Sequence, residues 1–144
     1  MIREAIDADI SRIVELGSRS LQDGPYKGRI EDNPEQTAKF AQQVIGGLGK
    51  VLLWEQDGKI VGLFAFIVYP HFFDGILTAN EVMWYVEQEC RGGGAAIKLL
   101  WAAEEAAKKL GVKRMGLSAP NKDVEELYKR FGYQRVEVAF ERRF

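Results

Sequence analysis

The amino-acid sequence predicts an α/β fold in which a mixed sheet is flanked by helices. Two apolar runs of strand-forming character, 51–54 and 60–68, are joined by Asp57-Gly58, a dipeptide that favours the positive φ angles of a tight hairpin. The second run is apolar at both parities, which is typical of a strand covered on both faces. Strands and helices alternate later in the chain, which together with the hairpin indicates a mixed sheet.

Local signals place the other elements. Asn33 suits a helix N-cap and is followed by Pro34, a residue favoured in the first helical turn. The expected elements are strand 2–4, a helix from Asp7 or Asp9 to Gly17, a loop or poorly ordered helix over 17–33, a helix from Asn33 to Gly46-Gly47, the hairpin, a loop over 69–79, strand 80–86, a helix from about Gly94 to Leu110, strand 112–118, helix 122–131 and a last strand or strand pair over 133–143. The predicted order is β-α-α-β-β-β-α-β-α-β.

Composition limits the function classes. The 144 residues fit one domain, 1–144, and the net charge of −1 gives no overall attraction to nucleic acid or an anionic membrane. Cys90 and His71 are the only cysteine and histidine, so the sequence predicts no internal disulfide and no cysteine or histidine metal cluster. No apolar run is typical of a signal peptide or a membrane span. We therefore expect a cytoplasmic protein without a metal.

A glycine-rich segment, Arg91-Gly92-Gly93-Gly94-Ala95-Ala96, lies between strand 80–86 and the long helix. The first amides of a helix lack backbone partners, and glycines let a bulky anion approach them closely. Arg91 adds a positive charge. The segment therefore predicts a phosphate site, with a plain flexible turn as the alternative. It matches neither GxGxxG nor the P-loop pattern.

Two patterns in this region resemble the GNAT N-acetyltransferase superfamily. Arg91, Gly94 and Ala96 fill the family pattern Arg/Gln-x-x-Gly-x-Gly/Ala at the start of its long helix. Asn121, Tyr128 and Gly132 match a second family pattern downstream, in the right order and with one strand between the two. The resemblance covers residues 50–140 well and the N-terminal third only by the order of elements.

The resemblance implies that the chain binds acetyl-CoA as a co-substrate and needs no metal. Strand 80–86 would splay from strand 112–118, the pantetheine arm would pair with the backbone in that gap, and the glycine segment would hold the pyrophosphate. The implied cofactor-binding residues are Trp84, Tyr85, Val86, Arg91, Gly92, Gly93, Gly94, Ala95, Ala96, Asn121 and Tyr128.

The implied reaction is direct attack of a primary amine on the thioester through a tetrahedral intermediate. Tyr128 matches the family's usual acid, although an aromatic residue here equally suits simple packing of its helix. Glu81 is the first candidate base and the loop residue His71 the second. Glu81 and Val86 have opposite parity along one strand, so a bulge is needed to bring Glu81 to the thioester. Glu87 is interpreted as a solvated surface charge.

The acceptor is a small-molecule or protein amine, and loops 17–33 and 69–79 are expected to line its pocket, with Tyr26, Phe72, Phe73 and Asp74 as candidates. A non-catalytic acyl-CoA-binding module, or an interaction protein that keeps the fold, is the alternative function. The last residues, Phe-Glu-Arg-Arg-Phe, alternate in character and suggest an edge strand for a homodimer.

Overall fold

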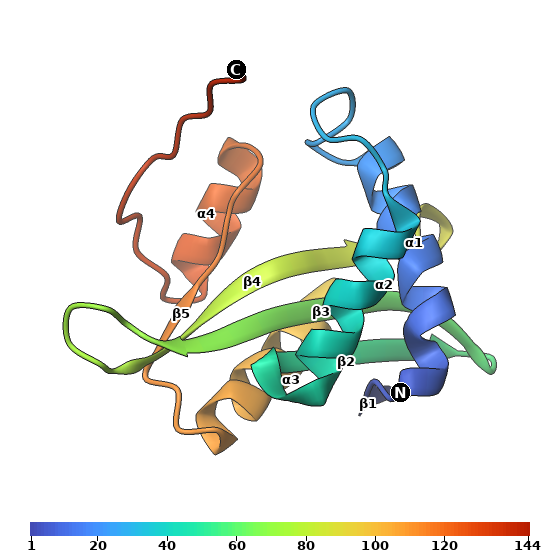
Figure 1. The fold of residues 1–144 in the computed structure, drawn as a ribbon, viewed down its shortest axis with the longest axis horizontal. Coiled ribbons are helices and arrows are strands. Elements are labelled where there is room, and N and C mark those ends of the chain that lie inside the picture. The colour runs from blue at the N-terminus through green and yellow to red at the C-terminus, as the bar shows by residue number, and fades with distance from the viewer.

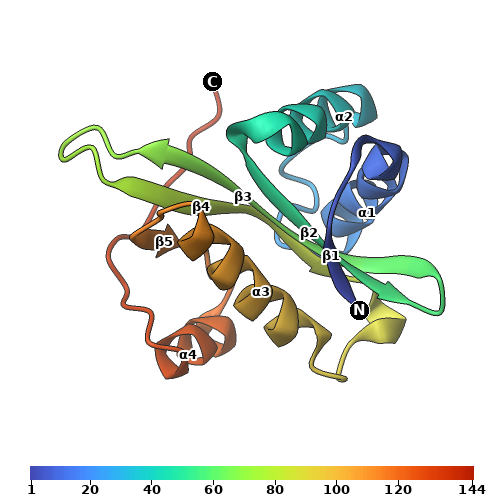
Figure 2. The same ribbon diagram turned by 90° about the horizontal axis from the view of Figure 1, so that it is seen from below.

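The computed structural model describes all residues, 1–144, and contains a five-stranded sheet with helices on both faces (Figure 1, Figure 2). The helices are the short turns η1 (Asp7–Asp9), η2 (Val44–Leu48) and η3 (Gln88–Cys90), and α1 (Ile10–Asp23), α2 (Pro34–Gln43), α3 (Ala95–Lys109) and α4 (Lys122–Arg130). The strands are β1 (Ile2–Glu4), β2 (Gly49–Gln56), β3 (Lys59–Pro70), β4 (Leu77–Val86) and β5 (Arg114–Gly116). No helix has both the length and the apolar character that a membrane span requires.

The sheet has the order β1-β2-β3-β4-β5, and its pairs are antiparallel except for the parallel pair of β4 and β5. The mixed sheet predicted from the sequence is therefore confirmed. Asp57 and Gly58 join β2 to β3 with φ angles of 52° and 73°, as the predicted tight hairpin requires.

Each face of the sheet has its own apolar core. Helices α1 and α2 cover one face, and α3 covers the other together with α4 (Figure 2). Alternate residues of β3 divide between the two cores: Phe64 and Phe66 pack towards α3, whereas Leu63 and Ala65 pack towards α1 and α2. This double coverage explains why the β3 sequence is apolar at both parities.

The expected stop of the first helix at Gly17 is wrong. Helix α1 continues through Gly17 to Asp23. Gly17 is buried, and a Cβ atom there would lie 3.3 Å from the Cγ2 atom of Thr37 in α2. Gly17 therefore allows α1 and α2 to approach each other closely, and it does not end α1.

The predicted last strand over 133–143 is absent, so the observed order ends at α4. Tyr133 is anchored by a 2.6 Å hydrogen bond from its hydroxyl to Glu104 of α3, but the residues after it pair with no strand. Val136, Val138 and Phe140 are exposed. The alternating pattern is present in this segment, but no strand of this chain lies beside it to complete a ladder.

Candidate functional site

The glycine segment forms an open turn between β4 and α3. Gly92 and Gly94 have φ angles of 92° and 80°, a backbone region that other residues enter with strain. A Cβ atom at Gly92, Gly93 or Gly94 would meet no atom within 4 Å. The turn thus leaves free space above its backbone, as an approaching phosphate requires.

The first amides of α3 are unpaired. The first hydrogen bond of the helix runs from the Lys98 amide to the Gly94 carbonyl at 3.0 Å. The amides of Ala95, Ala96 and Ile97 bond to no acceptor in the chain. These N–H groups and the helix dipole make the start of a 15-residue helix a favourable place for an anion.

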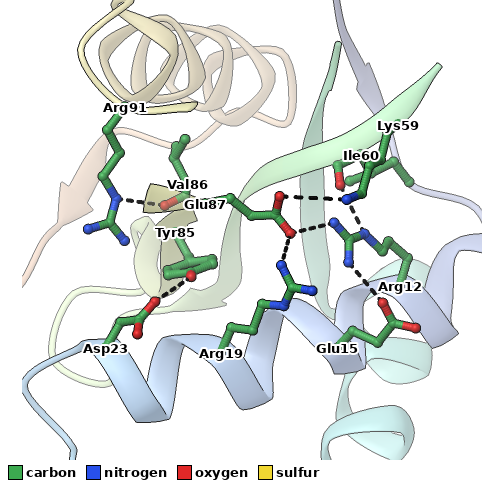
Figure 3. A network of polar contacts seen from close by, with 10 residues as sticks. All are labelled: Arg12, Glu15, Arg19, Asp23, Lys59, Ile60, Tyr85, Val86, Glu87 and Arg91. Atoms are coloured by element: carbon green, nitrogen blue, oxygen red, sulfur yellow. Dashed lines mark hydrogen bonds and ion pairs between the residues drawn. The ribbon is translucent and has the colours of Figure 1, made fainter. Parts of the chain in front are cut away.

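Arg91 lies beside this turn but is directed towards the end of β4. Its Nε donates a 2.7 Å hydrogen bond to the Val86 carbonyl, and its guanidinium lies 5.4 Å from the centre of the Tyr85 ring (Figure 3). To hold a phosphate through the guanidinium, Arg91 has to leave this carbonyl. That rotation would also free a backbone acceptor of β4.

A gap opens between β4 and β5, as the resemblance implied. The pairing of the two strands ends at Asn80 and Gly116, whereas β4 continues to Val86. The six residues beyond Asn80 extend about 20 Å without a neighbouring strand on this side.

Strand parity decides which backbone groups of β4 face this gap. The Glu87 amide donates to Val61 of β3 at 2.8 Å, so the backbone groups of Tyr85 face β3 as well. The groups of Trp84 and Val86 therefore face the gap. The side chain of Tyr85 lies on the face of the sheet that α1 and α2 cover, opposite to the side chains of Trp84 and Val86. There its hydroxyl donates to Asp23 of α1 at 2.7 Å (Figure 3). Burial and Asp23 raise the pKa of Tyr85 to about 12.

Glu81 reaches the gap through the bulge that the parity argument required. Ala65 pairs with Met83 and the next residue, Phe66, pairs with Glu81, so Val82 is the extra residue. The bulge reverses the parity, and Glu81 lies across from a residue of the α3-side core, on the same face as Trp84 and Val86.

Glu81 and Tyr128 meet at the backbone of Ser118. The Ser118 amide donates to the Glu81 carboxylate at 3.3 Å, and the Tyr128 hydroxyl donates to the Ser118 carbonyl at 3.0 Å. Burial raises the pKa of Glu81, and burial together with the nearby Glu81 charge raises that of Tyr128. The two candidate proton carriers therefore share one end of the gap, with Tyr128 neutral at physiological pH.

Trp84 lines the gap beside Tyr128. Their rings stack at 6.0 Å with an interplanar angle of 13°. The indole N–H groups of Trp84 and Trp54 are buried without a hydrogen-bond partner, and of the two only Trp84 is on β4.

Two other predicted residues have local roles in this structure. The Asn121 side chain caps α4 by accepting a 3.0 Å hydrogen bond from the Val124 amide. His71 lies in the β3–β4 hairpin, where it stacks on Phe72 and Phe73. Asp74 of this hairpin is paired with Arg114 at 2.8 Å. The hairpin precedes β4 and the glycine turn follows it, so His71 is at the opposite end of the strand from the turn.

The interpretation of Glu87 as a solvated charge is wrong. Its carboxylate is buried and pairs with Arg12 at 2.6 Å, with Arg19, and with Lys59 at 4.0 Å (Figure 3). Burial opposes ionisation, but these cations hold the pKa of Glu87 below its ordinary value. Glu87 thus ties the end of β4, next to the glycine turn, to helix α1. The one feature of the sequence that could have indicated its burial is its position directly after an apolar strand.

Comparisons with known proteins agree with this geometry. The family model described as the Acetyltransferase (GNAT) family matches residues 18–133. A search of curated proteins found no match. Among solved structures, a predicted acetyltransferase from Clostridium acetobutylicum, determined with acetyl-CoA, has a TM-score of 0.82 at 23% identity, covering 99% of this chain and 95% of that one.

Two further structures show the same fold. A ribosomal-protein-alanine N-acetyltransferase from Brucella melitensis biovar Abortus 2308 has a TM-score of 0.74 at 21% identity and covers 100% and 99% of the two chains. An aminoglycoside acetyltransferase from an uncultured soil metagenomic sample, in complex with trehalose, has a TM-score of 0.81 at 16% identity and covers 100% and 95%. With the family match spanning most of its length, the chain belongs to the acetyltransferase (GNAT) family.

Proposed function

We propose that this protein transfers an acetyl group from acetyl-CoA to a primary amine. One observation carries the proposal: the gap beside β4 has unpaired helix amides at one end and Tyr128 with Glu81 at the other. A ligand that combines a pyrophosphate with an extended, hydrogen-bonding arm fits such a site. The free space above the glycine turn supports the same ligand.

The residues have distinct roles in this proposal. Acetyl-CoA supplies the activated acetyl thioester. The α3 amides hold its phosphates, and the backbone groups of Trp84 and Val86 bind the arm along β4. The Trp84 N–H faces the gap on the side of Tyr128 and donates to the thioester oxygen, where negative charge develops. Tyr128 donates its phenolic proton to the departing sulfur after its hydroxyl turns from the Ser118 carbonyl.

Glu81 receives the proton of the attacking ammonium. Its carboxylate and the Tyr128 hydroxyl bind the amide and the carbonyl of one residue, Ser118, so acid and base lie on the same side of the reacting carbonyl. A raised pKa makes the carboxylate a stronger base than an exposed glutamate. The neutral Tyr128 is the form that can act as an acid.

The Tyr128→Phe variant tests whether the site is catalytic. We expect its kcat to fall by about 10²–10⁴, the usual contribution of a positioned acid, while binding of acetyl-CoA is kept. Thermal shift with acetyl-CoA, CoA and ATP measures binding, and thiol release with a panel of amines measures turnover. Tyr133→Phe is the control, because it removes a neighbouring phenol that is bonded to Glu104 instead. Equal kcat in wild type and Tyr128→Phe would assign the acid to another group, and binding of acetyl-CoA by the wild type without amine-dependent thiol release would favour the non-catalytic acyl-CoA-binding module.

The pH profile tests the role of Glu81. A base acts when ionised, so kcat/KM is expected to fall as the pH falls through the raised pKa of Glu81. The acid limb should therefore lie above 4.5, the ordinary value for glutamate. Glu81→Gln should remove this limb and reduce kcat, whereas Glu126→Gln on the exposed side of α4 should keep both. A limb that is unchanged in Glu81→Gln would assign the base to another group.

We propose that the acceptor is a primary amine, without naming a particular compound. The structural relatives include enzymes named for a protein N-terminal alanine and for aminoglycosides, so both protein and small-molecule amines belong in the screen. We place the acceptor on the α1–α2 face of β4, where the Tyr85 hydroxyl donates to the Asp23 carboxylate. A carboxylate at this position suits a cationic acceptor.

A further inference from the structure

The carbonyl oxygen of Val86 is the last backbone acceptor of β4 that faces the gap. Val86 lies opposite Gly62 of β3, but the groups that bond to β3 at this point belong to its neighbours, as the 2.8 Å bond from the Glu87 amide to the Val61 carbonyl shows. The N–H and the C=O of Val86 are therefore directed to a partner in the gap. In the proposed function, that partner is the arm of acetyl-CoA.

The side chain of Arg91 occupies this acceptor in the free protein. Its Nε donates to the Val86 carbonyl at 2.7 Å, and its guanidinium lies 5.4 Å from the centre of the buried Tyr85 ring (Figure 3). A hydrogen bond from a charged donor is stronger than one between neutral groups, and a cation within about 6 Å of an aromatic ring is attracted to it. These two contacts hold Arg91 across the position that an arm bound to the same carbonyl needs.

The charge of Arg91 has no carboxylate partner in the chain. The carboxylate of Glu87, which follows Val86 directly, is shared by three other cations, Arg12, Arg19 and Lys59 (Figure 3). An anion at the unpaired amides of α3 would be the first full negative charge that the guanidinium meets. Only three glycines separate Arg91 from the start of this helix, so no side chain stands between the guanidinium and such an anion.

On the basis of the proposed function, we propose that Arg91 determines the donor specificity of this site. It blocks the Val86 carbonyl in the free protein and leaves this carbonyl when a phosphate binds at the start of α3. An arm without phosphates has to displace Arg91 unaided. If Arg91 holds the carbonyl in about nine of ten molecules, the apparent affinity for such an arm is about tenfold lower, since only the open fraction binds. The site therefore selects thioesters that carry a diphosphate.

Calorimetric titration with acetyl-CoA and with acetyl-pantetheine, which has the same arm and thioester but no phosphate, tests this role. Arg91→Met keeps a long side chain but removes the charge and the donor. We expect it to bind acetyl-pantetheine about tenfold more tightly than the wild type does, because the carbonyl is open, and to bind acetyl-CoA more weakly, because the phosphates lose a cation. Lys109→Gln, which removes an exposed cation at the other end of α3, should leave both affinities unchanged.

Two simpler roles of Arg91 give different results in this titration. A phosphate ligand that does not block the carbonyl predicts weaker binding of acetyl-CoA and unchanged binding of acetyl-pantetheine in Arg91→Met. A brace of the glycine turn predicts that both ligands bind more weakly. Either result would overturn the specificity role of Arg91 alone, provided that the wild type binds acetyl-CoA. A wild type that binds no acetyl-CoA would contradict the proposed function as well.

NMR spectroscopy of the Arg91 Nε–H group checks the blocked state in the wild type, without a substitution. A hydrogen-bonded N–H exchanges slowly with water, so we expect a protected signal in the free protein. This signal should change its position when acetyl-CoA is added, because the guanidinium leaves the Val86 carbonyl and the Tyr85 ring. Rapid exchange in the free protein, or a signal that acetyl-CoA does not move, would contradict the proposal.

Discussion

The Gly94→Glu variant is expected to lose acetyl-CoA binding while it keeps its fold. The new carboxylate would stand at the N-cap of α3, where the unpaired amides and the helix dipole would hold the pyrophosphate. It would both occupy the amides and repel the phosphates. Space exists for the side chain, because nothing lies within 4 Å of a Cβ atom at Gly94.

Thermal shift measures this loss directly. At a ligand concentration of one hundred times Kd, the free energy of unfolding of the wild type rises by about 2.7 kcal/mol, or roughly 5–10 °C for a domain of this size. Gly94→Glu should show no shift. The matched control is Gly94→Gln, which carries the same backbone strain at φ 80° and nearly the same volume without the charge. Retained binding in Gly94→Glu would show that the phosphates bind elsewhere.

The geometry of the glycine segment is also the part of the candidate site that the sequence predicted best. Residues 91–96 sit at a strand–helix junction, and helix termini leave unpaired amides whatever the rest of the fold does. The roles of Gly92 and Gly94 are local too, since a positive φ angle is a property of a single residue. Unpaired helix amides and positive φ angles depend on short-range geometry, so they can be predicted from the sequence without a structure.

The side chains that meet across the gap were less predictable. Glu81 and Val86 have opposite parity along a regular strand, and the sequence does not show that Val82 is the extra residue of a bulge. The bulge arises from the pairing of β3 with β4, which is a long-range property. The shared contact of Glu81 and Tyr128 with Ser118 depends on the same pairing.

Two elements were mispredicted because a local pattern served a different purpose. Gly17 is typical of a helix end, but its missing Cβ allows α1 to approach Thr37 of α2. Residues 133–143 alternate like a strand, but a strand forms only beside a partner, and no strand of this chain lies next to them. In both cases contacts between residues far apart in the sequence decide how the pattern is used.

Replacement of the buried Glu87 is expected to have the largest effect on stability. Glu87→Ala should lower the free energy of unfolding by about 3 kcal/mol, because it removes a buried carboxylate that three cations share and takes one partner from the largely buried Arg12. Of the three cations, Arg12 is the least exposed, at 17%, so the loss of its partner costs most there. It keeps hydrogen bonds to the Ile60 carbonyl and to Glu15. Arg19 and Lys59 are 45% and 59% exposed and regain water. The expected fall in Tm is about 6–12 °C.

Glu89 and a glutamine variant separate the charge of Glu87 from its packing. Glu89→Ala removes an exposed carboxylate two residues further along the same turn and should change the free energy of unfolding by less than ~0.5 kcal/mol.

Glu87→Gln keeps the shape of the side chain but loses its charge. Because the cations lower the folded-state pKa of Glu87, its charge stabilises fully above the ordinary value of 4.5, and this contribution disappears as the pH falls through the lowered pKa. Wild type and Glu87→Gln should therefore differ most at neutral pH and converge in acid. A difference that is the same at every pH would mean that Glu87 stabilises the end of β4 by packing alone, and that the tie between α1 and the glycine turn is not electrostatic.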